Sequence, residues 1–124
     1  MSSGNYFETR RKAYNQRTKA ITGTYTTRAG GSGDTFIEDR VITITNPAAS
    51  FTLSVADGTY EGQELLITLL ANTGAKTVTL QEESGSAATN TDLAGTIVTA
   101  GMYWDLLWVN ASVGWVSIKE SVTT

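Results

Sequence analysis

The 124-residue chain contains no cysteine and no histidine. Without cysteine it cannot form a disulfide, a thiolate metal site or a cysteine nucleophile. Without histidine it is missing the side chain that most often serves as a general base, a zinc ligand or a pH switch. An Asp-x-Asp-x-Asp calcium loop is also missing from the sequence. These absences predict a protein that is not an enzyme and that holds neither a cofactor nor a metal.

Long apolar runs and proline are scarce as well. No apolar run approaches the roughly 20 residues that a membrane helix needs. The polar start of the chain, residues 1–12, does not contain the apolar core of a secretory signal. We therefore expect neither a membrane span nor export. The only proline follows Asn46, and that pair is a turn signal.

The composition favours β structure. Hydrophobic residues make up 40% of the chain and charged residues only 17%, with 12 glycines and abundant threonine and serine. Threonine suits half-buried pleated surfaces, and glycine suits turns. A chain of this length is expected to fold as one domain with a core of its own.

Charge is distributed unevenly along the chain. Residues 1–28 hold six basic residues against Glu8 alone, a net charge of +5, whereas residues 29–124 hold three basic residues against eleven acids, a net charge of −8. A basic segment on an acidic body indicates an arm that docks on an acidic surface. Its interleaved aromatic residues would also suit nucleic acid, but the acidic body disfavours a nucleic-acid face.

Residues 1–33 are predicted to form a basic N-terminal arm and a Gly-rich linker, followed by a β domain over residues 34–124. Residues 1–20 have little apolar content, and we expect them to become ordered on contact with a partner. Residues 21–28 favour an edge strand or an extended strap, and residues 29–34 form a flexible joint. The residues expected to anchor the arm are Tyr6, Phe7, Arg10, Arg11, Lys12, Tyr14, Arg17, Lys19 and Arg28.

Strand signals recur at short spacing after the joint, with no convincing helix. Several short strands at such spacing predict an all-β domain, a single antiparallel sandwich or a jelly-roll-like or barrel fold of about seven to eight strands. The expected strands cover residues 35–46, 50–55, 64–70, 76–80, 96–99, 102–109 and 115–119.

Two of these strands are apolar on both faces. In residues 64–70 and in residues 102–109, alternate positions on either side are hydrophobic, so both faces need to be covered. This predicts a central strand or a face buried by another subunit. Tryptophans on such strands fill a core, anchor an interface or form a sugar-stacking platform. The residues expected in the core or the subunit interface are Leu66, Leu70, Trp104, Leu106, Trp108 and Trp115.

Acidic residues are the remaining candidates for chemistry. Asp105 lies within an otherwise apolar strand, where a buried carboxylate often marks a functional site. Alternatively it pairs with Arg40 or Lys119, or accepts backbone N–H bonds. Sugar hydrolysis needs two carboxyl groups a few ångström apart, but no spacing selects a pair among Glu61, Glu64, Glu82, Glu83 and Asp92.

Two segments, residues 57–69 and 99–118, resemble the small β domains of bacteriophage virion proteins, namely capsid decoration (cement) proteins, head fibres and tail-fibre tips. The similarity extends roughly over residues 41–119. In those domains, a first unit consists of an apolar strand, the pairs Asp-Gly and Gly-Gln, and a second apolar strand. A second unit follows, which consists of Ala-Gly, an aromatic or apolar strand with one acidic residue, Trp, a turn and Trp-Val. The matching residues here are Asp57, Gly58, Gly62, Gln63, Ala100, Gly101, Asp105, Trp108, Trp115 and Val116.

This resemblance implies a structural homotrimer on the virion surface, made in the host cytoplasm. Because the chain is short for a fibre and has no repetitive shaft, we expect a capsid decoration protein. It would bind the major capsid protein through its N-terminal arm and stabilise the phage head. The alternative is a head-fibre, tail-fibre or receptor-binding tip module with a glycan ligand.

Overall fold

The computed structural model describes residues 15–30, 37–83 and 95–122; residues 1–14, 31–36, 84–94 and 123–124 lie outside the described part. The described part is all-β. Its nine strands are β1 (Asn15–Ile21), β2 (Tyr25–Thr26), β3 (Ile37–Thr45), β4 (Phe51–Val55), β5 (Glu64–Ala71), β6 (Val78–Glu82), β7 (Thr96–Ile97), β8 (Tyr103–Trp108) and β9 (Trp115–Ser121).

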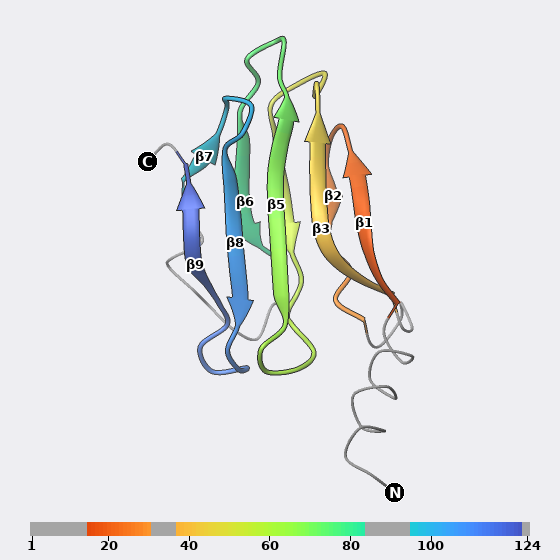
Figure 1. Ribbon diagram of the computed structural model, residues 1–124, viewed down its shortest axis with the longest axis vertical. Coiled ribbons are helices and arrows are strands. Elements are labelled where there is room, and N and C mark those ends of the chain that lie inside the picture. Colours follow the sequence, from red (N-terminus) through yellow and green to blue (C-terminus); the bar gives the residue numbers. More distant parts are fainter. Residues whose placement is uncertain (1–14, 31–36, 84–94, 123–124) are drawn as a thin grey trace, which may run out of the picture.

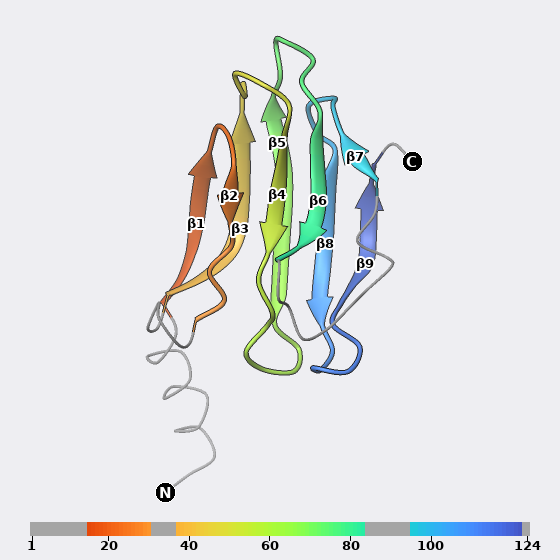
Figure 2. The ribbon, with the colours of Figure 1, turned by 180° about the vertical axis from the view of Figure 1, so that it is seen from behind.

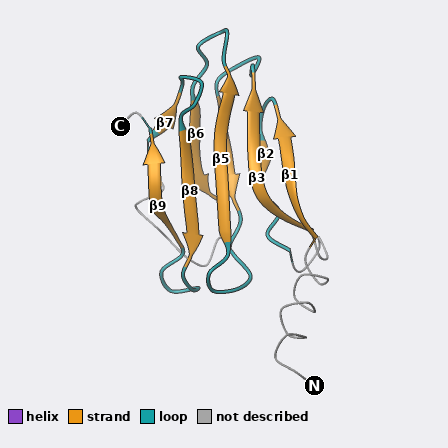
Figure 3. Ribbon diagram, in the orientation of Figure 1, coloured by secondary structure: helices purple, strands orange, loops and turns teal. Residues whose placement is uncertain are grey.

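The strands form two mixed sheets that face each other. The larger sheet has the order β1-β3-β5-β8-β9 and lies in front in Figure 1. The smaller sheet has the order β2-β4-β6-β7 and lies in front in Figure 2, which shows the molecule from behind. Figure 3 shows that strands account for nearly all of the regular structure in the described ranges. The sequence-based prediction of an all-β fold is confirmed for the described residues, and two mixed sheets are compatible with a sandwich-like arrangement.

The chain alternates between the two sheets over its first six strands. In the larger sheet β1, β3 and β5 pair in parallel. In the smaller sheet β2, β4 and β6 also pair in parallel. Each successive pair of strands therefore forms one coil, and three such coils stack side by side. The expectation of an antiparallel domain is wrong for these six strands.

Antiparallel pairing begins where the coils end. Strand β7 runs antiparallel to β6, β8 to β5, and β9 to β8. The error has a clear physical origin: an alternating strand followed by a short turn is compatible both with a hairpin and with a chain that crosses to an opposing sheet. The side-chain period is two in both cases, so the pattern does not distinguish them.

One hydrophobic core lies between the sheets. Fifteen apolar residues of the described ranges are buried there, and those on β3, β4 and β5 are almost fully shielded from solvent. Strand β5 occupies the centre of the larger sheet, as its sequence predicts. The buried apolar residues are Ile21, Ile42, Ile44, Leu53, Val55, Leu65, Ile67, Leu69, Val78, Leu80, Ile97, Trp104, Leu106, Trp108 and Trp115.

Asparagine side chains fix the turns at strand ends. The Asn72 amide donates to the carbonyl groups of Lys76 and Val98, both at 2.7 Å, and its oxygen accepts the Lys76 N–H at 2.9 Å. Asn46 Oδ1 accepts the Thr73 N–H at 3.0 Å. Asparagine hydrogen-bonds nearby backbone groups readily, which is why it is enriched in turns. These turns lie where the sequence predicts them.

Candidate functional site

Three of the basic residues assigned to the arm belong to the folded body. Arg17 and Lys19 lie on β1, and Arg28 follows β2 in the segment that pairs with the start of β3. The domain boundary expected near residue 33 therefore differs from the structure, in which residues 15–30 already contribute two strands. The other six anchoring candidates, Tyr6, Phe7, Arg10, Arg11, Lys12 and Tyr14, lie outside the described residues.

Asp39 organises the contacts of the first coil. Its side chain is buried, and its Oδ1 accepts a bond from Arg17 Nε at 2.6 Å. Its Oδ2 accepts bonds from the Tyr25 hydroxyl at 2.6 Å and the Arg28 amide at 2.9 Å. Lys19 Nζ lies 5.7 Å from the centre of the Tyr25 ring, within cation–π range. Both basic side chains of β1 therefore contact Tyr25 or Asp39 inside the same chain.

This arrangement shifts two pKa values. Burial, followed by the hydrogen bond to Asp39, raises the pKa of Tyr25 to about 12. The hydrogen bond to Asp39 is also the main cause of the raised pKa of Arg17. The phenol therefore stays protonated and the guanidinium stays charged at neutral pH, which keeps all three donors of Asp39 in place.

Glu38 is a second fully buried carboxylate, next to Asp39 in the sequence. The Tyr60 hydroxyl lies 2.9 Å from Oε1 and 2.8 Å from Oε2, and Gln16 Nε2 donates to Oε2 at 3.1 Å. Sequence analysis missed both carboxylates. An available signal was the Glu-Asp-Arg run inside an otherwise apolar strand, because charged residues there require buried partners. Through these hydrogen bonds, Glu38 and Asp39 hold β1 and the 56–63 loop against β3.

The tryptophans fill the core. Trp104, Trp108 and Trp115 are 0%, 4% and 2% exposed, so the alternative of a sugar-stacking platform on these rings is wrong. Trp108 and Trp115 meet edge to face, with ring centres 5.5 Å apart. A Cβ atom on Gly58 would lie 2.2 Å from the Trp108 ring, so the glycine permits a close approach of the loop to the ring.

The outer face of the larger sheet carries half-exposed aliphatic side chains at its centre. Leu66 on β5 lies in register with Val41 on β3, and Leu107 on β8 lies in register with Val116 on β9. We call Val41, Leu66, Leu107 and Val116 the outer aliphatic face. Two other apolar side chains of this sheet are more exposed, namely Leu70 at 57% and Ile118 at 52%. Of the predicted core or interface residues, Leu106 and the tryptophans are in the core, whereas Leu66 and Leu70 are not.

Asp105 lies at the middle of β8, half-exposed, opposite Leu66 and Lys119 in the register of the sheet. Its exposure contradicts the idea of a buried carboxylate at this position. Arg40, one of its expected partners, instead pairs with Glu64 at 2.8 Å. Asp105 therefore adds a polar group to the outer aliphatic face.

Both free edges of the larger sheet carry features that oppose strand addition. On β1, Arg17 and Lys19 contact residues of the other strands, and the register shifts between Arg17 and Thr18. On β9, the register of pairing with β8 shifts between the partners of Asp105 and Leu106. Inward charges and β-bulges are common protections against edge-to-edge pairing. The sheet is therefore better suited to contact through its face than through its edges.

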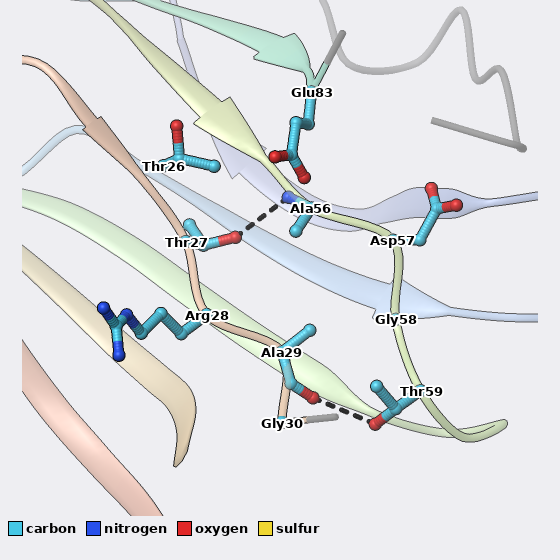
Figure 4. Close-up of a pocket in the computed structure, with 10 residues that line it drawn as sticks. All are labelled: Thr26, Thr27, Arg28, Ala29, Gly30, Ala56, Asp57, Gly58, Thr59 and Glu83. Atoms are coloured by element: carbon cyan, nitrogen blue, oxygen red, sulfur yellow. Dashed lines mark hydrogen bonds between the residues drawn. The ribbon is translucent and has the colours of Figure 1, made fainter. Parts of the chain in front are cut away.

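A polar pocket of about 540 Å³ lies beyond the ends of β2, β4 and β6 (Figure 4). Two short segments form its walls, and hydrogen bonds from Ala56 N to Thr27 Oγ1 at 3.1 Å and from Thr59 Oγ1 to the Ala29 carbonyl at 2.9 Å join them. We call this the strand-end pocket. Its lining residues are Thr26, Thr27, Arg28, Ala29, Gly30, Ala56, Asp57, Gly58, Thr59 and Glu83.

One of the carboxylates considered for hydrolysis, Glu83, lines the pocket together with Asp57. Glu61 and Glu64 instead lie further along the loop and on β5. The other carboxylate considered for hydrolysis, Asp92, lies outside the described residues. Among the described residues, no group of three or more acidic side chains is placed to hold a metal ion.

The described residues include no helix that is long and apolar enough to span a membrane. No protein-family model matches the chain, and no curated protein matches it significantly. The functional assignment below therefore depends on the residues and the geometry of this chain.

Proposed function

We propose that the chain is a structural, homo-oligomeric protein of a phage virion surface, a capsid decoration protein. The observation that carries the proposal is the outer aliphatic face, four half-exposed aliphatic side chains on four neighbouring strands of the larger sheet, β3, β5, β8 and β9. Apolar side chains grouped on one exposed face commonly mark an interaction site.

The layout of the face favours a closed assembly of identical subunits. Charged side chains lie among the aliphatic ones: Asp105 is opposite Leu66, Glu64 is opposite Leu107, and Asp105 has Lys119 as its register partner on β9. Protein interfaces of the non-obligate kind commonly combine apolar and polar groups in this way. Closed rotational symmetry would bury this face in every copy. A trimer is the state that the resemblance to virion domains implies.

The capsid-anchoring role is then assigned to the segment before β1. Arg17 and Lys19 bind within the subunit and Arg28 belongs to the segment that pairs with β3, so the proposal assigns this role to Arg10, Arg11 and Lys12. In a trimer, three arms would act together, and avidity would strengthen a contact that is weak for one arm. The acidic surface that these arms would meet is the major capsid protein.

Binding to empty heads of the phage that encodes the chain tests this proposal. The full chain with Arg10→Gln, Arg11→Gln and Lys12→Gln should lose most of its co-sedimentation with the heads. A variant with Lys76→Gln, which alters a basic residue outside the arm and the outer aliphatic face, should bind nearly as well as the original chain. Deleting residues 1–28 is a poor test, because that deletion removes β1 and β2. Full binding by the triple variant would refute the anchoring role.

The strand-end pocket favours the second candidate, a receptor-binding tip module with a glycan ligand. Thr26 and Thr59 hydroxyls and the Glu83 carboxylate offer hydrogen-bond partners to a polyhydroxylated molecule. Because all three tryptophans are buried, their fluorescence would be a poor reporter of such binding. A glycan array probed with the full chain and with Glu83→Gln is the direct test: binding that the substitution abolishes would favour this candidate.

A further inference from the structure

We propose that residues 15–30 form a strap that opens as a unit while the rest of the protein stays folded. The strap contains β1, β2 and the segment that follows β2. The buried carboxylate of Asp39, on β3, holds it closed. The opening is a property of the chain itself and does not depend on the proposed function.

The strap contributes little to the hydrophobic core. Of the fifteen buried apolar residues of the described ranges, only Ile21 belongs to the strap, and Tyr25 is partly buried against the same cluster. All the others lie on β3 to β9. Because the stabilisation from burial scales with the apolar area removed from water, opening the strap gives up only a small part of it.

Polar groups attach the strap to the body, and three of its bonds converge on Asp39. Oδ1 of Asp39 accepts a bond from Arg17 Nε at 2.6 Å. Its Oδ2 accepts bonds from the Tyr25 hydroxyl at 2.6 Å and the Arg28 amide at 2.9 Å. These donors come from β1, from β2 and from the segment after β2. One side chain outside the strap therefore holds all three of its parts.

Strand pairing attaches the strap on one side only. Strands β1 and β2 stand at the ends of the orders β1-β3-β5-β8-β9 and β2-β4-β6-β7, so each has a single neighbour. Only Tyr25 and Thr26 of β2 pair with β4. Figures 1 and 2 show both strands along the same side of the molecule. The strap can therefore separate without breaking the pairing between any other strands.

This way of attaching the strap favours a low free energy of opening. When the strap opens, Asp39 and its donors exchange bonds with each other for bonds with water, so the net loss is much smaller than the gross strength of the bonds. Segments with few buried apolar contacts generally open at a lower free energy than the core strands. We therefore expect the strap to open far more often than the whole protein unfolds.

One consequence of this opening rests on the proposed function. The segment to which we assign the capsid-anchoring role directly precedes β1 in the chain. A load on that segment reaches β1 before the other described strands, so it would open the strap and leave the core folded. The opening itself is measured on the protein alone, and a failure of capsid binding would not affect it.

Hydrogen exchange of the full chain, followed by NMR for each amide, tests the proposal. The Thr27 amide, which donates to the Ser54 carbonyl at 2.9 Å, reports on the strap. The Leu69 amide, which donates to the Met102 carbonyl at 3.1 Å, reports on the core. Relative to unstructured reference rates, Thr27 should be protected at least about ten-fold less than Leu69. Equal protection of the two amides would overturn the proposal.

A substitution in the core distinguishes opening of the strap from unfolding of the whole protein. Ile97→Val removes one methyl group from a fully buried side chain on β7 and should accelerate exchange at Leu69 by about two- to ten-fold. Exchange at Thr27 should not change, because β7 stays folded when the strap opens. Equal acceleration at both amides would show that the strap opens only when the protein unfolds, which contradicts the proposal.

Substitutions at the carboxylate distinguish opening of the strap from local fraying at Thr27. Asp39→Asn should accelerate exchange at Thr27 by about ten-fold or more, and Leu69 by the same factor, because the closed form is the reference for both openings. Tyr25→Phe removes one of the three bonds, so it should have a smaller effect and replaces the first variant if that one does not fold. The matched control, Asp105→Asn, should leave Thr27 unchanged. Unchanged exchange at Thr27 in the Asp39 and Tyr25 variants would refute the role of the carboxylate.

Discussion

Arg17 and Asp39 occupy paired positions on β1 and β3, and Arg17 Nε donates to Asp39 Oδ1 at 2.6 Å across this pair. Asp39 also accepts bonds from Tyr25 and from the Arg28 amide. One buried carboxylate thus connects β1, β2 and the segment after β2 to the second coil. Arg17 and Arg28, which the charge distribution assigned to a basic arm, therefore belong to the folded body.

Replacing Asp39 with asparagine should destabilise the protein strongly. The amide keeps the shape of the side chain but removes the charge that accepts bonds from Arg17, Tyr25 and the Arg28 amide, and losing hydrogen bonds to a buried charged group costs about 1.5 to 3 kcal/mol. Urea unfolding should show a lower free energy of unfolding by about this amount. Asp105→Asn, on the half-exposed outer face, should change it by less than about 0.5 kcal/mol. Equal effects of the two substitutions would contradict this role of Asp39.

Tyr25 should make the protein sensitive to alkaline pH. Its pKa in the folded protein is raised to about 12 from 10.0, so folding favours the protonated phenol. The stabilisation is fully present below pH 10 and is lost as the pH rises from 10 toward 12. The urea midpoint of the original chain should fall over this range, and Tyr25→Phe should show a smaller fall. Parallel pH profiles for the two proteins would show that Tyr25 does not contribute.

Gly58→Ala should disturb the packing of the loop on Trp108. The added methyl group would meet the indole ring at 2.2 Å, and overpacking of this kind costs about 1 to 3 kcal/mol. Gly23→Ala is the matched control, because a Cβ there has no neighbour within 4 Å. Thermal unfolding followed by tryptophan fluorescence should separate the two variants. Equal melting temperatures would contradict the close approach.

The sequence was sufficient to predict the strands after the joint, their turns and the central place of β5, because each depends on local side-chain alternation and turn chemistry. It was not sufficient to predict how the strands pair. Phe51 to Val55 alternates in the same way in a hairpin and in a crossover to the opposing sheet, and only the partners Val78 to Glu82 distinguish these arrangements. Parallel pairing is a non-local property of the fold.

The candidate site was predicted only in part. Leu66 was expected in the core or a subunit interface, and the structure places it half-buried on the face opposite to its core neighbours Leu65 and Ile67. The roles of Arg17 and Lys19 were not predictable from charge, since a basic residue in an arm and one bonded to a buried carboxylate look the same in a sequence. The strand-end pocket was also missed, because its walls come from segments far apart in the chain.

The solution mass of the full chain, measured by light scattering during size-exclusion chromatography, tests the central claim that the outer aliphatic face joins subunits. We expect a stable mass of about three times the 13.2 kDa of one chain. Leu66→Gln with Leu107→Gln should shift the mass toward that of a monomer without unfolding, because both side chains are only half-buried. Val113→Gln, at an exposed loop position, should leave the trimer intact. A monomer of the unaltered chain, or a trimer that survives the double substitution, would contradict the account.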